Sequence, residues 1–298
     1  MPTLGEGYIR AYSKTGYDRR YEDKVFAAGT RCIEMVDYVG AGDQPGDYLG
    51  VYYCRSESFY RCFANASFGG PCIVDIGEFP ASEYSADGEK GGKKTINMAA
   101  AFRNIAGRCQ SQRGCRDQTI NMAAAFRNSD IEILPHGCSR GLIDNTNSMF
   151  EGCRFLRNWS PQEMVAAGLA GVRDPAAPRI LRGNGIAESA FLLHLAPKKM
   201  RRMFAGCEKY SGRNINSISW ANLQDEKAAM DFAVGCRFEP HYLSGIIEWL
   251  HRQMFVHGTV RTPLLAVNLG SGKVTGNTAA MARQLIDAGI ELQGFEIQ

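Results

Sequence analysis

The sequence predicts an α+β protein in which a solenoid of short helical turns and short strands lies between a β-rich N-terminal domain and a C-terminal strand–helix–strand cap. Residues 95–104 recur letter for letter as residues 119–128, which indicates an internal repeat. The residues before 90 are rich in aromatic residues and punctuated by glycine, whereas residues 261–298 alternate between strand and helix patterns. We therefore expect domains at residues 1–90, 91–260 and 261–298.

The N-terminal residues also differ from the rest of the chain in charge. Residues 1–90 hold 9 Lys and Arg against 14 Asp and Glu, a net charge of −5, whereas residues 91–298 hold 25 against 17, a net charge of +8. The sign changes near residues 87–94, a polar, glycine-rich stretch that indicates either a domain boundary or an exposed loop. Opposite net charges favour docking of one half of the chain on the other half of a neighbouring copy. Strand-forming residues at 47–54 and 72–77 predict a small β domain before this point.

The repeat continues beyond its two identical copies. Phe102 and Phe126 belong to these copies, and Phe150 follows Phe126 at the same spacing. Further copies share a kernel of Met, Phe, a small residue, Gly and Cys, and they lie at residues 147–153, 200–207, 230–236 and, weakly, 254–258. In the copies that end at Cys207 and Cys236, a tryptophan follows the cysteine at the same distance.

The kernel predicts how each copy packs. Met200 and Phe204 are four residues apart, so they lie on one face of a short helical turn. Gly206 then ends that turn with a positive φ, and Cys207 begins a buried extended segment. One unit is too small to bury its Phe alone, so neighbouring units must stack around a continuous core. The expected repeat core consists of Phe102, Phe126, Phe150, Cys153, Trp159, Met203, Phe204, Cys207, Trp220, Phe232, Cys236 and Trp249.

Two further elements complete the expected architecture. The long gap between Phe150 and Phe204 leaves room for a helical insertion at about 160–195, which begins with Ser, Pro and Glu at favourable N-terminal helix positions. The C-terminal residues predict a strand at 262–269, a helix at 277–288 and a strand at 289–297. A solenoid needs such an atypical terminal unit to cover its exposed end.

The kernel Met-x-x-Met-Phe-x-Gly-Cys, followed by Trp, resembles the BspA-type leucine-rich-like repeats of bacterial surface proteins. The resemblance covers roughly residues 95–260 and is most specific at 147–159, 200–220 and 230–249. It implies a leucine-rich-repeat-like solenoid with a role in surface interaction. Repeats of this family occur in bacterial surface adhesins, in mycoplasma lipoproteins and in some bacteriophage particle proteins.

Composition excludes several classes of protein. With 45% hydrophobic and 22% charged residues, the chain of 298 residues is neither disordered nor a collagen or coiled-coil rod. No stretch approaches the roughly 18 apolar residues of a membrane span, so we expect none. The first residues lack the basic and apolar regions of a secretory signal, which favours assembly in the cytoplasm and release by lysis.

Motifs for catalysis, cofactors or metals are weak. Residues 270–273, Gly-Ser-Gly-Lys, match only part of a phosphate-binding loop, because Val267 and Val274 stand where Gly and Ser or Thr are required. The sequence holds no Cys-x-x-Cys, no close histidine pair and no Gly-x-Ser-x-Gly elbow. We therefore expect no cofactor, no metal site and no enzyme activity.

One basic cluster is a candidate docking patch. Lys198, Lys199, Arg201 and Arg202 form the densest group of positive charges. They either make a solvated face or dock an acidic protein surface or an anionic glycan. Aromatic residues do not interleave these charges, so we expect no nucleic-acid binding.

The ten cysteines form two groups. Cys153, Cys207 and Cys236 share one repeat position and are expected to be small buried residues. The others fit no repeat rule and are candidates for disulfides within or between chains, which would require an environment outside the reducing cytosol. These are Cys32, Cys54, Cys62, Cys72, Cys109, Cys115 and Cys138.

These observations favour a non-enzymatic structural or attachment protein. We expect a component of a bacteriophage virion, in the tail, neck or capsid surface, that contacts other virion or surface proteins and copies of itself. A glycan or host surface is a further candidate partner. The alternatives are a bacterial cell-surface adhesin or host-interaction protein, and an enzyme with a site between the N-terminal domain and the solenoid.

Overall fold

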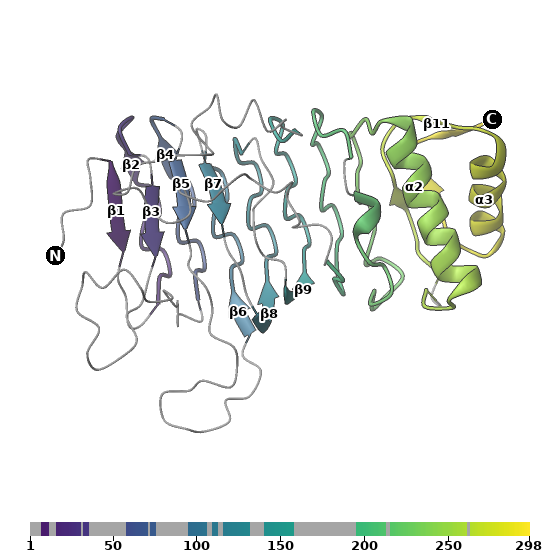
Figure 1. The fold of residues 1–298 in the computed structure, drawn as a ribbon, viewed down its shortest axis with the longest axis horizontal. Helices are drawn as coiled ribbons and strands as arrows, with labels where there is room; N and C mark the ends of the chain where they lie inside the picture. Colours follow the sequence, from purple (N-terminus) through teal and green to yellow (C-terminus); the bar gives the residue numbers. More distant parts are fainter. Residues whose placement is uncertain are drawn as a thin grey trace, which may run out of the picture.

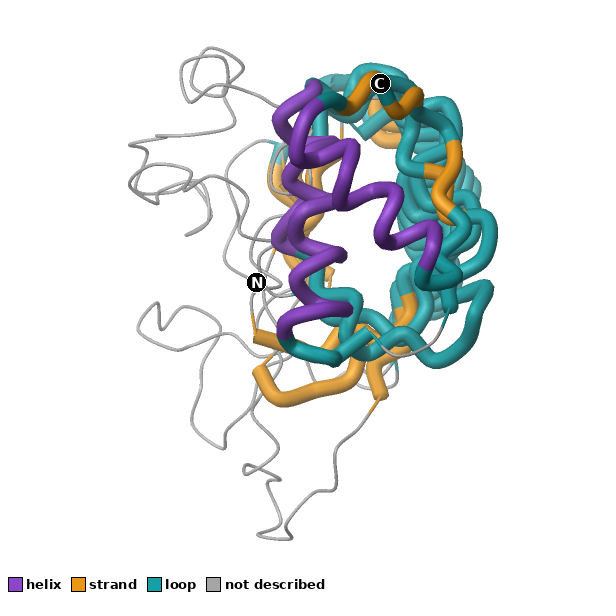
Figure 2. Tube along the Cα trace, turned by 90° about the vertical axis from the view of Figure 1, so that its right-hand side faces the viewer, coloured by secondary structure: helices purple, strands orange, loops and turns teal. Residues whose placement is uncertain are grey.

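The computed structural model describes residues 7–11, 16–30, 32–35, 58–70, 72–75, 95–105, 109–112, 116–131, 140–157, 195–212, 215–260 and 263–298. In these residues the chain winds into successive coils that lie side by side along the longest axis of the molecule (Figure 1). The N-terminal coils lie at one end, and helices α2 (Pro240–His251) and α3 (Gly276–Asp287) lie at the other. Figure 2 views the molecule from the helical end, with the coils one behind another.

A four-stranded parallel sheet joins the N-terminal coils. Its strands are β1 (Tyr8–Ala11), β3 (Cys32–Met35), β5 (Cys72–Asp75) and β7 (Cys109–Gln112), in that spatial order. The boundary predicted near residue 90 does not separate two sheets, because β5 and β7 pair across it. Residues on both sides of it also belong to one continuous apolar core. Of the two strands expected here, 72–77 corresponds to β5, and 47–54 lies outside the described residues.

A second parallel sheet contains the identical repeats. Its strands are β6 (Thr95–Asn97), β8 (Arg116–Asn121) and β9 (Arg140–Asn145), in that spatial order. A separate short sheet pairs β2 (Val25–Phe26) with β4 (Ser67–Phe68). The register places Thr95 opposite Thr119, Ile96 opposite Ile120 and Asn97 opposite Asn121. One repeat of the identical copies therefore forms one coil, and identical residues of the two copies lie side by side.

Each coil contains a turn segment bounded by two left-handed residues four positions apart, with φ between 51° and 82°. Within a segment short turns close locally, as where the Arg103 N–H donates to the Ala100 carbonyl. The sequence predicts a short helical turn here, but the left-handed residue at each end interrupts a helix. The turn segments are residues 19–23, 61–65, 100–104, 124–128, 148–152, 202–206, 231–235 and 266–270.

Backbone hydrogen bonds join each turn segment to the next. The N–H groups of Ala100, Phe102 and Asn104 donate to carbonyls of the following segment over 2.9, 2.7 and 2.8 Å. The same three bonds recur one repeat later over 2.8, 2.9 and 2.7 Å, from Ala124, Phe126 and Asn128. A buried polar backbone group is costly unless it is paired, so this ladder stabilises the otherwise irregular coil backbone.

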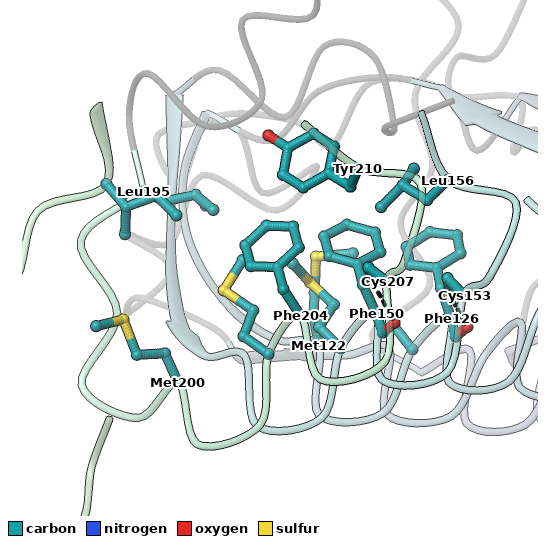
Figure 3. Close-up of a cluster of buried hydrophobic side chains, with 14 of the residues drawn as sticks. Met122, Phe126, Phe150, Cys153, Leu156, Leu195, Met200, Phe204, Cys207 and Tyr210 are labelled. Carbon is teal, nitrogen blue, oxygen red and sulfur yellow. Dashed lines mark hydrogen bonds between the residues drawn. The ribbon is translucent and has the colours of Figure 1, made fainter. Parts of the chain in front are cut away.

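An aromatic column fills the core behind the turn segments. Successive rings stack at centroid distances between 5.0 and 5.5 Å, and Figure 3 shows its later members. Offset stacked rings at this spacing add to the stabilisation from buried area. The column consists of Tyr21, Phe63, Phe102, Phe126, Phe150 and Phe204.

The column changes at the last copy of the kernel. The Gly206 N–H donates to the Val234 carbonyl, a register in which Ala233, not Phe232, is equivalent to Phe204. The register therefore follows the shared Gly-Cys pair of the two copies, residues 206–207 and 235–236. Phe232 instead matches Met203, and its ring meets Phe204 edge-on at 5.6 Å.

The remaining core residues divide by burial. Phe102, Phe126, Phe150, Cys153, Met203, Phe204, Cys207, Trp220, Phe232 and Cys236 are buried. Trp249 is half-buried on α2 and packs against this core, and Trp159 lies outside the described residues. The expected helical insertion at 160–195 falls almost wholly outside them as well.

The C-terminal residues contain helices and short strands. A 3₁₀-helix (Ile215–Ser217) precedes α2, and a π-helix (Arg252–Val256) follows it. The sequence predicts a weak repeat copy where this π-helix lies. Helix α2 itself was not predicted. The residue that caps the N-terminus of helix α3 is Thr275, two residues before Asn277, where the sequence predicts the start of this helix. The strands β10 (Val267–Asn268) and β11 (Lys273–Val274) pair in parallel with β12 (Leu292–Gln293) and β13 (Glu296–Ile297), respectively.

Candidate functional site: the turn face

The turn segments present a ladder of side chains, which we call the turn face. Their second left-handed position holds Asp23, Asn65, Asn104 and Asn128 and then glycine, including Gly152. Each asparagine Nδ2 donates to the side-chain oxygen one coil earlier, over 2.9, 2.9 and 3.4 Å. The amide column ends at Gly152, where an added Cβ would overlap Asn128 Oδ1. Glycine is thus required both by its φ of +74° and by the asparagine beside it.

The next position explains the recurrent cysteine. The thiols of Cys153, Cys207 and Cys236 each donate to the carbonyl of the column phenylalanine one coil earlier, over 2.9, 3.0 and 2.9 Å. Figure 3 shows the first two of these hydrogen bonds. In an earlier coil the hydroxyl of Ser129 donates in the same way to the Phe102 carbonyl. Sequence reasoning expected burial here but missed the acceptor, although serine at the same repeat position was a signal.

Burial makes these thiols unreactive. It raises the pKa of Cys153 and Cys236 to about 12 and that of Cys207 well above its usual value. A thiol that stays protonated is a poor nucleophile and a poor metal ligand. This column of sulfur atoms is therefore structural.

Two carboxylates organise the charges of the turn face. Glu22 pairs with Arg19 at 3.6 Å and with Arg61 of the next coil. Glu151 accepts from Arg127 at 3.3 Å and from Arg202 at 3.1 Å, so it connects three coils. Both carboxylates are mostly buried and each is shared by two arginines, which distinguishes these pairs from isolated surface pairs of little energetic value.

The Glu151 carboxylate is ionised within this network. Burial alone raises its pKa, but hydrogen bonds from Ser148 and Arg202 and the charges of Arg127 and Arg202 outweigh burial and lower it. Both arginines reach the same oxygen, Oε1. Glu151 Oε2 and Arg127 Nε are buried without a hydrogen-bond partner among the described residues.

The structure divides the candidate docking patch. Arg202 is committed to Glu151 and to Asp231, the latter at 3.3 Å. Lys198 is exposed and lies 4.0 Å from Asp144. Lys199 and Arg201 are exposed, and their side chains have no ion-pair partner in the part of the chain that the structure describes. Two of the four basic side chains are thus available for a partner.

The other candidate residues fall into place more simply. Gly270 ends the turn segment 266–270 beside the Cys236 carbonyl, and Lys273 pairs with Glu296 at 3.1 Å. Cys62 and Cys72 are buried and form no disulfide in the described part of the chain, so the structure does not support these two residues as disulfide candidates. Cys32 lies on β3 and Cys109 on β7, but the structure does not describe their side chains. Cys54, Cys115 and Cys138 lie outside the described residues altogether. The register aligns Cys109 with Cys72.

The described residues contain neither a group of three or more His, Cys, Asp or Glu side chains that could hold a metal ion nor a helix long and apolar enough to cross a membrane. No protein-family model, curated protein or solved structure matches the chain. The membership in the BspA-type repeats stays a prediction.

Proposed function

We propose that the protein is a non-enzymatic structural or attachment protein, and that its coils form a leucine-rich-repeat-like solenoid that presents the turn face to other proteins. The observation that carries this proposal is the uninterrupted ladder of backbone hydrogen bonds between turn segments. It runs from the Tyr21 N–H, which donates to the Cys62 carbonyl, to the Gly206 N–H, which donates to the Val234 carbonyl. It holds side chains of distant residues in straight rows along one surface.

Rigidity is what makes such a surface suitable for binding. Association is weakened by the entropy lost when loops and side chains become ordered, and a preformed surface avoids much of that loss. The paired coils, the stacked rings and the shared ion pairs all limit motion of the turn segments before a partner arrives. Lys199 and Arg201 are exposed just before the turn segment 202–206, and their charges, unpaired among the described residues, favour an acidic partner.

The biological setting that we propose is a bacteriophage virion, with the bacterial cell surface as the alternative. The support is the resemblance of the kernel Met200–Cys207 to repeats used in surface and particle proteins. The partners are other virion or surface proteins, including copies of this chain.

Cross-linking of intact particles with an amine-reactive reagent tests the proposal. We expect the chain in purified particles, with cross-links from Lys199 to other proteins. Lys273 is the matched control, because it is also exposed but pairs with Glu296 in the C-terminal cap. Absence from particles, together with labelling on intact bacterial cells, would favour the surface alternative. Cross-links confined to Lys273 would contradict the assignment of the turn face.

A further inference from the structure

One position of the turn face breaks its pattern of charge pairing. Arg61, Arg127 and Arg202 each have a carboxylate from a neighbouring coil. Arg103 is exposed, and its guanidinium has no partner among the described residues. It follows Phe102 as Arg127 follows Phe126, so the two arginines occupy equivalent places on adjacent coils.

Arg103 and Arg127 carry like charges at equivalent positions of adjacent coils. The Asn104 N–H donates to the Arg127 carbonyl at 2.8 Å, which holds the two backbones in direct contact. Like charges on directly opposed residues of paired chains destabilise them. Arg127 is already paired with Glu151, whereas the guanidinium of Arg103 has no partner in the described part of the chain and is free to bind. A carboxylate placed between the two side chains would reduce the repulsion and pair with the guanidinium of Arg103.

Small side chains precede these arginines in both repeats. Ala99 and Ala100, and their repeats Ala123 and Ala124, carry no side chain beyond Cβ, and we call these four residues the alanine floor. Ala99, Ala123 and Ala124 are partly exposed, and Ala100 is buried. A partner backbone can therefore approach both guanidinium groups closely. Arginine forms two parallel hydrogen bonds with a carboxylate in this kind of arrangement.

We propose that Arg103, Arg127 and the alanine floor bind a short acidic segment of a partner protein through its carboxylates. The inference rests on the proposed function and names the partner chemistry for one part of the turn face. A short segment is favoured over a long polyanion because Glu22 and Glu151 stand on the same row, on either side of the arginines. A nucleic acid or sulfated glycan that followed the row would meet both carboxylates.

Fluorescence anisotropy of the full chain with a labelled hexaglutamate peptide at low salt tests this site. We expect Arg103→Gln to weaken binding about tenfold, the effect of losing one charge-assisted pair. Arg283→Gln on α3 removes the same charge from another exposed position and should leave affinity unchanged. Ala123→Trp keeps the charge but covers the floor, and it should weaken binding as well. Circular dichroism establishes that each variant is folded.

Several results would overturn the proposal. They are equal affinity of wild type and Arg103→Gln, equal losses in Arg103→Gln and Arg283→Gln, or no binding of hexaglutamate by the wild type. Tighter, Arg103-dependent binding of a DNA duplex or of heparin would also overturn it, in favour of a polyanion site. Cross-linking at Lys199 is independent of Arg103, so failure of this site and failure of the protein-binding platform give different patterns.

Discussion

The thiol of Cys153 donates a hydrogen bond to the carbonyl oxygen of Phe126, in the preceding coil, over 2.9 Å. This contact links the two columns of the core, because the same phenylalanine stacks on Phe150 at 5.5 Å. The cysteine position is thus defined by a hydrogen-bond donor as well as by volume. Because Ser129 supplies the donor in an earlier coil, serine is a natural substitute.

Cys153→Ser should therefore be tolerated better than Cys153→Val. Serine keeps a donor for the Phe126 carbonyl, whereas valine leaves that carbonyl buried and unpaired, a loss of about 1–3 kcal/mol. Urea unfolding followed by circular dichroism measures both free energies. Equal stability of the two variants would show that the thiol acts through its volume alone.

Gly152→Ala should destabilise the protein more than Gly258→Ala. Both glycines have positive φ, which costs a substituted side chain about 1–2 kcal/mol. An added Cβ at Gly152 also overlaps Asn128 Oδ1, whereas nothing lies within 4 Å at Gly258. Thermal unfolding of the two variants measures the difference, and identical melting temperatures would show that the asparagine side chain moves aside freely.

Phe126→Ala should lower the free energy of unfolding by about 3–5 kcal/mol, since it removes a buried ring from the middle of the column. Phe155, which is 43% exposed, is the matched control. Phe155→Ala should change stability by no more than about 0.5 kcal/mol. Chemical denaturation provides both values, and a large loss in the control variant would contradict this view of the core.

Acid should remove the contribution of the Glu151 carboxylate to the free energy of unfolding. Its pKa is lower in the folded protein than in the unfolded chain, where a glutamate has a pKa of about 4.3. The stabilisation is therefore complete above that value and is lost as the pH falls through the folded pKa. Unfolding measured between pH 7 and pH 3 should show a steeper loss for the wild type than for Glu151→Gln. Parallel pH profiles would mean that the carboxylate pairs equally well in both states.

Part of this architecture follows from local sequence and part does not. The period of the repeat, the positive φ at Gly152 and Gly206, and the burial of the column phenylalanines all depend on residues close in sequence. The turn segments 19–23 and 61–65 were missed, because the gaps from one column ring to the next are much longer there than between the identical copies. Their signal is faint: Phe63-Ala-Asn65 matches Phe102-Arg-Asn104 at the ring and at the amide.

The candidate site shows the same division. The basic cluster was visible in the sequence, but its members differ in use, because Glu151 and Asp231 come from other coils to occupy Arg202. The pairing of Arg103 with Arg127 as neighbours was implicit in the repeat. Only the tertiary structure shows how the two arginines differ. Glu151 of the following coil pairs with Arg127, whereas Arg103 has no carboxylate partner among the described residues.

The amino-acid sequence is enough to place like residues of the identical copies together, because a parallel register aligns equal positions. It does not establish which coils join the stack or which arginines are neutralised. Those features depend on contacts between separate coils. Connections of variable length separate the coils, so spacing along the chain no longer indicates which residues meet.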